Sequence, residues 1–364
     1  LVTSHNRHVS GLISDTGDAD ELSIKSDLTL TFGYPKLGLY LNQGSSLTGK
    51  VEVLDIGIPK NIIPQSKIHL ITRSWAKNVI PNRPKNAHKG TFGKTLIIGG
   101  SKFYTGAPYL SAIAAARSGV GLVTLAVTSD IQKSVSSLTP IPTYLPLSDF
   151  SNETSRDYNI EMLLNNIAKY KSVLIGPGFG TAVETQRFLQ GLLEKKPKLP
   201  PAILDADAIN MLNKNDKEDW WSNLPSETIL TPHLAEFSRL TNLSIDKINS
   251  DKINIASNIA SESKTFIILK GANTIVATPT GTIFISPFAN PSLATAGTGD
   301  VLAGIIAGFL AQGLSPESAS ILAVFVHGQA GKYVNCQYGD QGALASDLLE
   351  YIPKSIKHIS NQNS

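Results

Sequence analysis

NPSLATAGTGDVLAGIIAGFLAQG, residues 290–313, is the stretch that decides the expected fold and chemistry of this chain. Within it, Ala296-Gly297-Thr298-Gly299-Asp300 stands directly before an apolar run with helical spacing. A helix N-terminus leaves backbone N–H groups unpaired and carries partial positive charge, so it attracts anions, phosphate above all. Asp300 is unfavourable beside a bound phosphate unless it accepts a proton from a hydroxyl group that attacks the phosphorus. The alternative is a plain glycine loop in which Asp300 caps the helix.

The chain from about residue 92 onward alternates strand-like and helix-like segments. Continuous apolar runs predict buried parallel strands at residues 95–98, 122–127, 172–175, 202–204, 227–230 and 266–269. Residues 273–278 and 282–286 flank Pro-Thr-Gly and predict a hairpin. Helical patterns cover residues 108–118 and dominate from residue 300 to about 356. The expected fold class is therefore α/β, with a mostly parallel central sheet covered by helices on both faces.

Glycine-containing or polar segments follow four of these expected strands. They are Gly176-Pro177-Gly178-Phe179-Gly180, DADAIN at residues 205–210, TPHLAE at residues 231–236 and KGANT at residues 270–274. In open α/β sheets, ligands bind beyond the carboxyl ends of the strands. The agreement in position of the four segments therefore predicts one shared site.

Each of these segments also has a purely structural interpretation. Gly-Pro-Gly is a common turn, Asp205 is equally suited to cap a helix, and a lone histidine such as His233 is more often structural. The helix dipole favours a carboxylate such as Glu236 in a first helical turn. Lys270 is better explained as an anion contact, because a buried strand end rarely carries an unpaired lysine. His327 lies in an apolar helical run and is expected to pack in the core.

Composition narrows the class of protein further. A hydrophobic content of 41% over 364 residues suits a globular protein with a sizeable core. The net charge of +3, without a basic run interleaved with aromatic residues, gives no support for nucleic-acid binding and suits anionic small molecules. Cys336 is the only cysteine, so no intrachain disulfide is possible and a reduced compartment is expected. No stretch has the length of a membrane span or the pattern of a signal peptide, so we expect a cytoplasmic protein without a membrane partner.

Taken together, these segments resemble the ribokinase-like NAD(P)H-hydrate dehydratase family over about residues 70–356. The motifs that carry the resemblance are His88-Lys89-Gly90 with Gly93, Gly99-Gly100-Ser101, Tyr104-Thr105-Gly106-Ala107, GPGFG, LDADAIN, TPHLAE, LKGANT and NPSLATAGTGDVLAG. The resemblance implies a ribokinase-like fold and the repair of nicotinamide cofactor hydrated at C6 of its ring. Family members dehydrate the S epimer of NADH hydrate or NADPH hydrate at the expense of ADP, as is typical of bacterial members, or of ATP. Mg²⁺ is expected at such a phosphoryl transfer.

The same resemblance implies roles for particular residues. Asp300 would accept the proton of the C6 hydroxyl group as this group attacks the terminal phosphoryl group, and Glu236 is a candidate for orienting Mg²⁺ through water. The implied substrate-binding residues are Ala107, Gly178, His233 and Asp300. The implied nucleotide-binding residues are Lys270, Gly271, Ala272, Asn273, Thr274, Gly297, Thr298 and Gly299.

The N-terminal part, residues 1–60, resembles the end of the NAD(P)H-hydrate epimerase domain that precedes the dehydratase in many two-domain enzymes. The matching pieces are SGL at 10–12, DTG at 15–17, TLTFGYPKLGL at 29–39, GKVEV at 49–53 and DIGIP at 55–59. Residues 61–91 are expected to be a linker and lead-in, and residues 92–356 the dehydratase domain. Most of the epimerase domain is absent and Arg7-His8-Val9 replaces its acidic catalytic position, so we expect no epimerase activity from this chain.

Two other functions share some of these features. A ribokinase-like kinase of a vitamin precursor would share GTGD and the fold, but it would release a stable phosphorylated product. A non-catalytic nucleotide-binding remnant would fit a chain whose first domain is incomplete. Related bacterial enzymes suggest a homo-oligomer, a tetramer by analogy.

Overall fold

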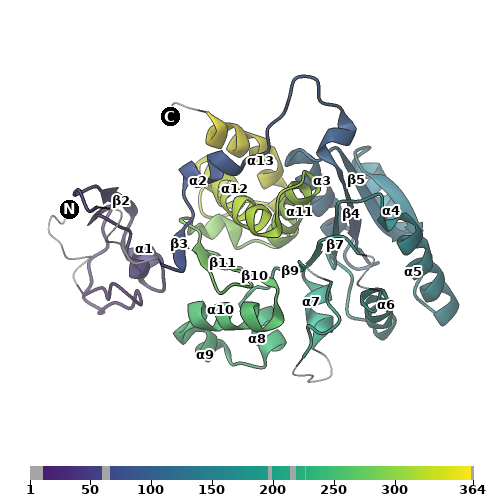
Figure 1. Ribbon diagram of the computed structural model, residues 1–364, viewed down its shortest axis with the longest axis horizontal. Helices are drawn as coiled ribbons and strands as arrows, with labels where there is room; N and C mark the ends of the chain where they lie inside the picture. Colours follow the sequence, from purple (N-terminus) through teal and green to yellow (C-terminus); the bar gives the residue numbers. More distant parts are fainter. Residues whose placement is uncertain (1–10, 60–65, 196–198, 214–218, 226, 362–364) are drawn as a thin grey trace.

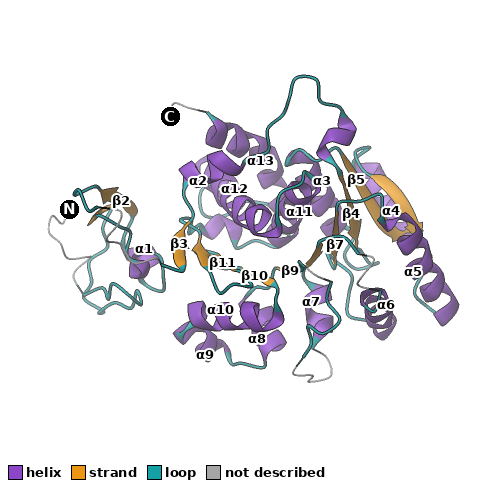
Figure 2. Ribbon diagram, in the orientation of Figure 1, coloured by secondary structure: helices purple, strands orange, loops and turns teal. Residues whose placement is uncertain are grey.

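A ten-stranded sheet runs through the computed structural model, which describes residues 11–59, 66–195, 199–213, 219–225 and 227–361 (Figures 1 and 2). In spatial order the strands are β3 (Ile68–Leu70), β12 (Ile283–Ile285), β11 (Ile275–Ala277), β10 (Phe266–Leu269), β9 (Ile229–Leu230), β8 (Ala202–Leu204), β7 (Ser172–Ile175), β4 (Lys94–Ile98), β5 (Leu122–Thr128) and β6 (Thr143–Leu147). Within the described residues only β11 runs antiparallel to its neighbours. The predicted mostly parallel sheet and the hairpin of β11 and β12 are confirmed.

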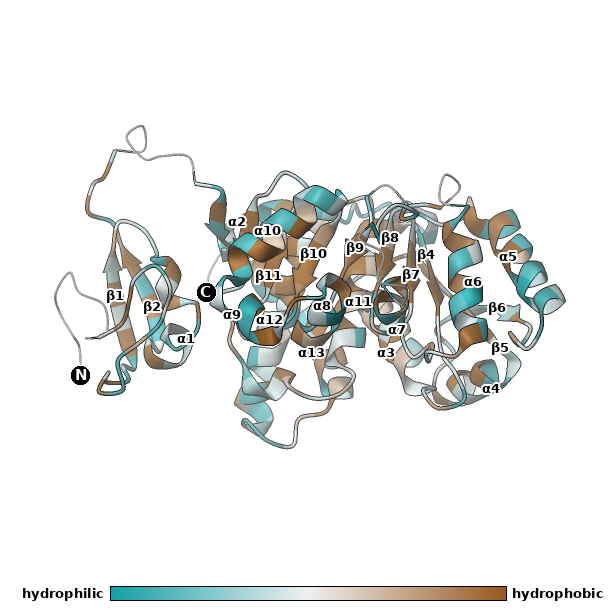
Figure 3. Ribbon diagram, turned by 90° about the horizontal axis from the view of Figure 1, so that it is seen from below, coloured by the Kyte–Doolittle hydropathy of each residue, from teal (hydrophilic) through white to brown (hydrophobic). Residues whose placement is uncertain are grey.

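Helices cover both faces of this sheet (Figure 1). One face carries α2 (Arg73–Val79), α3 (Gly106–Arg117), α4 (Ser129–Leu138), α11 (Thr298–Ala311), α12 (Pro316–Tyr338) and α13 (Ala345–Ser360). The other carries α5 (Glu153–Ile167), α6 (Val183–Leu193), α7 (Asp207–Leu212), α8 (Leu234–Thr241), α9 (Ile245–Ser250) and α10 (Lys252–Ser263). Successive residues of a strand point to opposite faces, so Leu96 and Ile98 join one apolar core while Ile97 joins the other. Both faces of the strands are therefore hydrophobic, as Figure 3 shows in brown.

The carboxyl ends of the central strands lie level with one another. Parallel register pairs the end residues of β4, β7, β8 and β9, which are Ile98, Ile175, Leu204 and Leu230. The segments after these residues consequently leave the sheet at one edge. This is the edge at which the sequence predicted the site.

The N-terminal segment forms a small unit beside β3 (Figure 1). Strands β1 (Leu28–Phe32) and β2 (Lys50–Leu54) pair in parallel, and the 3-10 turn η1 (Leu37–Leu39) and helix α1 (Gly44–Leu47) lie between them in sequence. Its own buried core is small, because so few residues enclose little apolar surface. The assignment of residues 1–60 to an epimerase remnant stays a prediction, and Arg7-His8-Val9 lies outside the described residues.

The region predicted as a linker, residues 61–91, contains regular structure. Strand β3 pairs in parallel with β12, and the ring of His69 stacks on Phe284 with 5.2 Å between centroids. Helix α2 comes next, capped by the Thr72 side chain. The linker prediction was wrong for residues 68–79, because β3 is too short to give an apolar run and its pairing partner is distant in sequence.

No helix in the described part of the chain has the length and apolarity to cross a membrane.

Candidate active site

The GTGD segment begins helix α11 and is tied down by its own side chains. Gly297 is the N-cap residue with φ +92°, a left-handed conformation that glycine adopts without strain. The hydroxyl group of Thr298 donates to the carbonyl oxygens of Leu293 (2.8 Å) and Thr295 (2.9 Å). The carbonyl oxygen of Thr298 lies 3.0 Å from Nε2 of His327, which is buried as predicted. Thr298 and His327 thus fix the shape of the loop.

Asp300 is the third residue of α11 and does not cap it, because the N-cap is Gly297. Its carbonyl oxygen accepts a hydrogen bond of 3.0 Å from Ser111 of α3. In the described part of the structure its carboxylate forms no hydrogen bond. The capping alternative for Asp300 is therefore wrong, and its carboxylate is available for a ligand.

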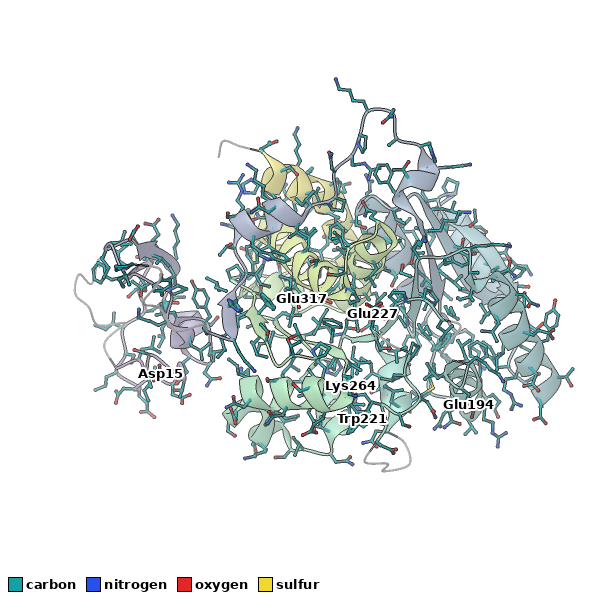
Figure 4. The ribbon with its side chains drawn as sticks, in the orientation of Figure 1. Asp15, Glu194, Trp221, Glu227, Lys264 and Glu317 are labelled. Atoms are coloured by element: carbon teal, nitrogen blue, oxygen red, sulfur yellow. The ribbon has the colours of Figure 1, made fainter. Side chains whose placement is uncertain are left out.

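A buried group of charges lies next to Asp300. Nζ of Lys270, at the end of β10, is 3.0 Å from Oδ1 of Asp205 and 3.8 Å from Oε2 of Glu236. Only 1% of the Asp205 side chain and 6% of the Glu236 side chain is exposed. Carboxylates are more often exposed to solvent, as is Asp15, which lies at the outside of the molecule in Figure 4. Burying a charge is unfavourable unless the charge is paired. In this cluster Lys270 is paired with both Asp205 and Glu236.

The charges of the cluster change the pKa values of its members. Burial raises the pKa of Asp300 to about 7; the carboxylate of Asp205 adds to the rise and the ammonium of Lys270 opposes it. Burial acts to lower the pKa of Lys270, but the carboxylates of Asp205 and Glu236 outweigh this effect and hold the pKa above its ordinary value. Lys270 is therefore cationic at neutral pH, while Asp300 is poised between its two protonation states.

The same lysine brings the GTGD and KGANT segments together. A Cβ atom added to Gly299 would lie 3.1 Å from Nζ of Lys270, so this ammonium group sits against the first turn of α11. Lys270 and Gly299 were both predicted to bind nucleotide. Their proximity joins the end of β10 to the helix N-terminus.

His233 and Glu236 form a capping box at the start of α8. Nδ1 of His233 accepts hydrogen bonds from the backbone N–H groups of Ala235 (3.1 Å) and Glu236 (3.3 Å), and Oε2 of Glu236 accepts one of 2.8 Å from the backbone N–H of His233. Nε2 of His233 is 3.4 Å from Oε1 of Glu236. Partial burial lowers the pKa of His233, with Lys270 adding to the decrease. Both residues therefore cap α8, and this cap places a neutral, half-exposed imidazole beside the charge cluster.

The KGANT loop is held at both ends and open in the middle. The backbone N–H of Lys270 donates to Pro232 (2.8 Å), and that of Asn273 donates to Phe288 (3.0 Å). Gly271 and Ala272 between them are exposed. The hydroxyl group of Thr274 donates to the carbonyl oxygen of Gly271 at 3.1 Å. The side chains of Asn273 and Thr274 therefore shape the loop, and its exposed backbone is what a ligand can reach.

The GPGFG loop closes against the segment that contains Ala107. A Cβ atom added to Gly178 would lie 2.7 Å from the carbonyl oxygen of Tyr104 and 3.0 Å from Cβ of Ala107. The backbone N–H of Gly180 donates to Oδ2 of Asp207 at 2.7 Å, which fixes the loop to α7. Ala107 and Gly178, both predicted to bind substrate, are thus close neighbours.

Gly178→Ala is expected to weaken substrate binding and folding together. Gly178 has φ +66°, and a methyl group there would press on backbone atoms that cannot move away. We expect the free energy of unfolding to fall by about 1–3 kcal/mol. Gly106→Ala is the matched control, because a Cβ atom at Gly106 meets nothing within 4 Å and its φ is not positive. Equal denaturation midpoints for the two variants would contradict the close packing at Gly178.

Sequence reasoning missed Asp205 and Asp207 as site residues. Asp205 was equally consistent with a helix cap, but the N-cap of α7 is Ala206 and the side chain of Asp205 bonds Lys270 and Thr231 instead. The signal was present in the DADA segment directly after a buried strand. The sequence does not show which residue Asp205 contacts, because its partner Lys270 lies at the end of another strand.

This arrangement defines a ribokinase-like α/β protein in which the N-terminus of α11 lies at the carboxyl ends of the central strands. A ribokinase-like superfamily protein from Enterococcus faecalis superposes with a TM-score of 0.70 at 27% identity, covering 82% of this chain and 98% of that one. The ADP/ATP-dependent NAD(P)H-hydrate dehydratase from Bacillus subtilis, co-crystallised with ATP/Mg²⁺, superposes with a TM-score of 0.69 at 26% identity, covering 81% of this chain and 100% of that one.

The chain belongs to the NAD(P)H-hydrate dehydratase family, whose model matches residues 95–354. It is 38% identical over 356 residues to the bifunctional NAD(P)H-hydrate repair enzyme Nnr of Moorella thermoacetica, an alignment that covers 97% of this chain and 66% of that enzyme. The chain thus spans about two thirds of the length of this curated relative. The family predicted from the sequence motifs is confirmed.

Proposed function

We propose that this chain is a lyase that dehydrates the S epimer of NADH hydrate and NADPH hydrate, driven by ADP or ATP. The observation that carries the proposal is the free Asp300 carboxylate in the first turn of α11, next to Lys270 and with a pKa of about 7. Membership of the dehydratase family and the similarity to the Bacillus subtilis enzyme support it.

The first step is phosphorylation of the substrate. The C6 hydroxyl oxygen of the hydrated ring attacks the terminal phosphorus of the nucleotide, the bond from that phosphorus to the bridging oxygen breaks, and Asp300 accepts the hydroxyl proton. A carboxylate with a raised pKa is a stronger base than an ordinary one and is still ionised in part at neutral pH. The backbone N–H groups of Gly297 to Asp300 would stabilise the charge on the phosphoryl group in transfer.

The second step is elimination. Hydroxide is a poor leaving group, whereas the phosphorylated C6 oxygen departs as phosphate when the ring nitrogen supplies its electron pair. Loss of a proton from C5 then restores the double bond of the reduced nicotinamide. With ADP the products are NAD(P)H, AMP and phosphate. The substrate contacts proposed are Ala107, Gly178, His233 and Asp300.

The nucleotide would lie along the KGANT loop with its phosphates toward Lys270 and α11. No group of three or more His, Cys, Asp or Glu side chains within the described residues is arranged to hold a metal ion. The oxygens of Glu236 already contact His233 and Lys270. These residues fit a Mg²⁺ ion that is bound mainly by nucleotide phosphates and that Glu236 reaches only through water.

Incubation with hydrated NADH, Mg²⁺ and either ADP or ATP tests the proposal. We expect the absorbance of reduced nicotinamide to return with at least one nucleotide, and to about half of its full value from an even mixture of epimers if no epimerase activity is present. The comparison of ADP with ATP decides the co-substrate. A stable phosphorylated product without recovered NADH would indicate the vitamin-type kinase, and no reaction with either nucleotide would reject both enzymes.

The pH dependence of the reaction should report on Asp300. Because burial raises the pKa of this group to about 7, the ionised base is lost as the pH falls through that value. We expect kcat/KM to decrease about tenfold per pH unit below pH 7. His233 does not account for such a limb, because its pKa is lowered from its ordinary value. A profile that stays flat down to pH 5.5 would exclude Asp300 as the base.

The oligomeric state and the location stay predictions from the sequence. We propose a homo-oligomer, a tetramer by analogy, in the cytoplasm. The mass in solution measured by light scattering tests the first point.

A further inference from the structure

We infer that the N-terminal segment positions the nucleotide-binding loop, through a hydrogen bond from Ser45 to Asn273. This inference rests on the proposed function, since it assigns a partner to the KGANT loop of the same site. Oγ of Ser45, on α1, donates to Oδ1 of Asn273 at 2.5 Å across 228 positions of sequence.

Both the burial and the backbone conformation of Asn273 restrict which residue can occupy this position in the loop. It is buried to 5% exposure and has φ +51°, a left-handed conformation that non-glycine residues rarely adopt and that asparagine tolerates best. Its amide nitrogen donates to the carbonyl oxygen of Ser286 at 2.9 Å, and its backbone N–H donates to Phe288 at 3.0 Å. Both of these partners belong to the segment after β12. Ser45 supplies the hydrogen bond to the remaining amide oxygen.

A buried amide oxygen without a donor is unfavourable. Within the described residues, Ser45 is the donor that satisfies Oδ1 of Asn273. Without it, this oxygen would have no donor among the described residues, which destabilises the present conformation of Asn273, two residues after the exposed Gly271. The conformation of the ligand-facing backbone thus depends on a residue outside the part of the chain that the family model matches.

Ser45 is itself held firmly. The backbone N–H of Gly44 donates to the carbonyl oxygen of Gly17 at 2.9 Å, and a Cβ atom at Gly44 would collide with the carbonyl oxygen of Gly38. Leu41, just before α1, is buried in the same apolar cluster as Leu269 and Ile275, which flank the KGANT loop. The N-terminal segment therefore docks on the strands that carry the loop, and Ser45 is fixed relative to it.

Ser45 is accordingly a positioning residue, and Ser45→Ala tests it. We expect the Kd for ATP or ADP, measured directly by calorimetry, to rise by up to about tenfold, because loss of this hydrogen bond shifts the loop away from the conformation that binds nucleotide. The KM for nucleotide should rise in parallel, while the KM for hydrated NADH should not change. Ser46→Ala is the matched control, because the exposed Ser46 hydroxyl bonds only the nearby carbonyl oxygen of Gln43 among the described residues.

The outcomes separate the inference from the function on which it rests. Wild-type turnover with equal nucleotide Kd values for Ser45→Ala, Ser46→Ala and wild type would overturn the inference and leave the proposed function intact. Absence of wild-type turnover would overturn the function, whereas the direct Kd values would still decide whether Ser45 acts on the loop. A rise in both KM values together with a lower denaturation midpoint would show a general structural role and would also overturn the inference.

Discussion

Asp300→Asn is expected to abolish catalysis while the protein keeps its nucleotide and becomes more stable. Asparagine is nearly the same size but is not a base, so turnover should fall about 10³-fold. Nucleotide affinity should be retained or increased, because the substitution removes a negative charge that is proposed to face the phosphates. Turnover is followed by nicotinamide absorbance and affinity by calorimetry. Equal losses of turnover and affinity would mean that Asp300 has a structural role.

The difference in stability between Asp300→Asn and wild type should depend on pH in a definite direction. Because the folded protein raises the pKa of Asp300 to about 7, the protonated group is compatible with folding at low pH, and the protein loses stability as the pH rises from the unfolded pKa to the folded one. This penalty is about 4 kcal/mol above pH 7, since the pKa rises by about three units. We expect the variant to melt a few degrees higher than wild type at pH 8 and at the same temperature at pH 4. Asp130→Asn, at an exposed position of α4, is the control.

Lys270→Met should have the second large effect, on nucleotide affinity and on folding. Loss of the ammonium group removes the cation that is proposed to face the phosphates, and it leaves the buried Asp205 carboxylate with the Thr231 hydroxyl as its one remaining partner among the described residues. We expect nucleotide affinity to fall at least about 100-fold, and the free energy of unfolding to fall by about 3 kcal/mol. Lys247→Met, at an exposed site on α9, should change neither.

A second substitution separates these two losses. Asp205→Asn in the Lys270→Met background removes the uncompensated charge, so most of the stability should return while nucleotide affinity stays low. The pKa of Asp300 offers a further measurement, because Lys270 opposes its rise. In any folded Lys270→Met preparation the acidic limb of kcat/KM should move to higher pH. An unmoved limb with normal nucleotide affinity would place Lys270 outside the site.

The fold was predictable where the sequence repeats one local signal. Apolar runs such as residues 95–98 and 172–175 have to be buried on both faces, and parallel strands covered by helices satisfy this requirement. The glycine and polar residues after those runs then had to meet at one edge. Strand β3 was missed, because three residues give no period and its stability comes from the pairing of Ile68 with Ile283.

The site was predictable as a set of segments but not as a set of contacts. Nothing local to Asp205 distinguishes a helix cap from a partner for Lys270, which is 65 positions away. The contact of Ser45 with Asn273 spans 228 positions and leaves no local trace. Local propensity governs caps such as the His233–Glu236 pair, whereas charge pairing across strands depends on the completed sheet.

The place of β3 at the end of the sheet has a consequence for where this protein can be divided. The matched family region begins at residue 95, yet β3 lies earlier in the chain and covers the edge of β12. A fragment that begins at residue 92 would present the backbone groups of Ile283, Phe284 and Ile285 to any other unpaired strand, and such edges promote association between molecules. The smallest unit that closes the sheet therefore includes residues 68–70, although the residues proposed for the chemistry all come later in the chain.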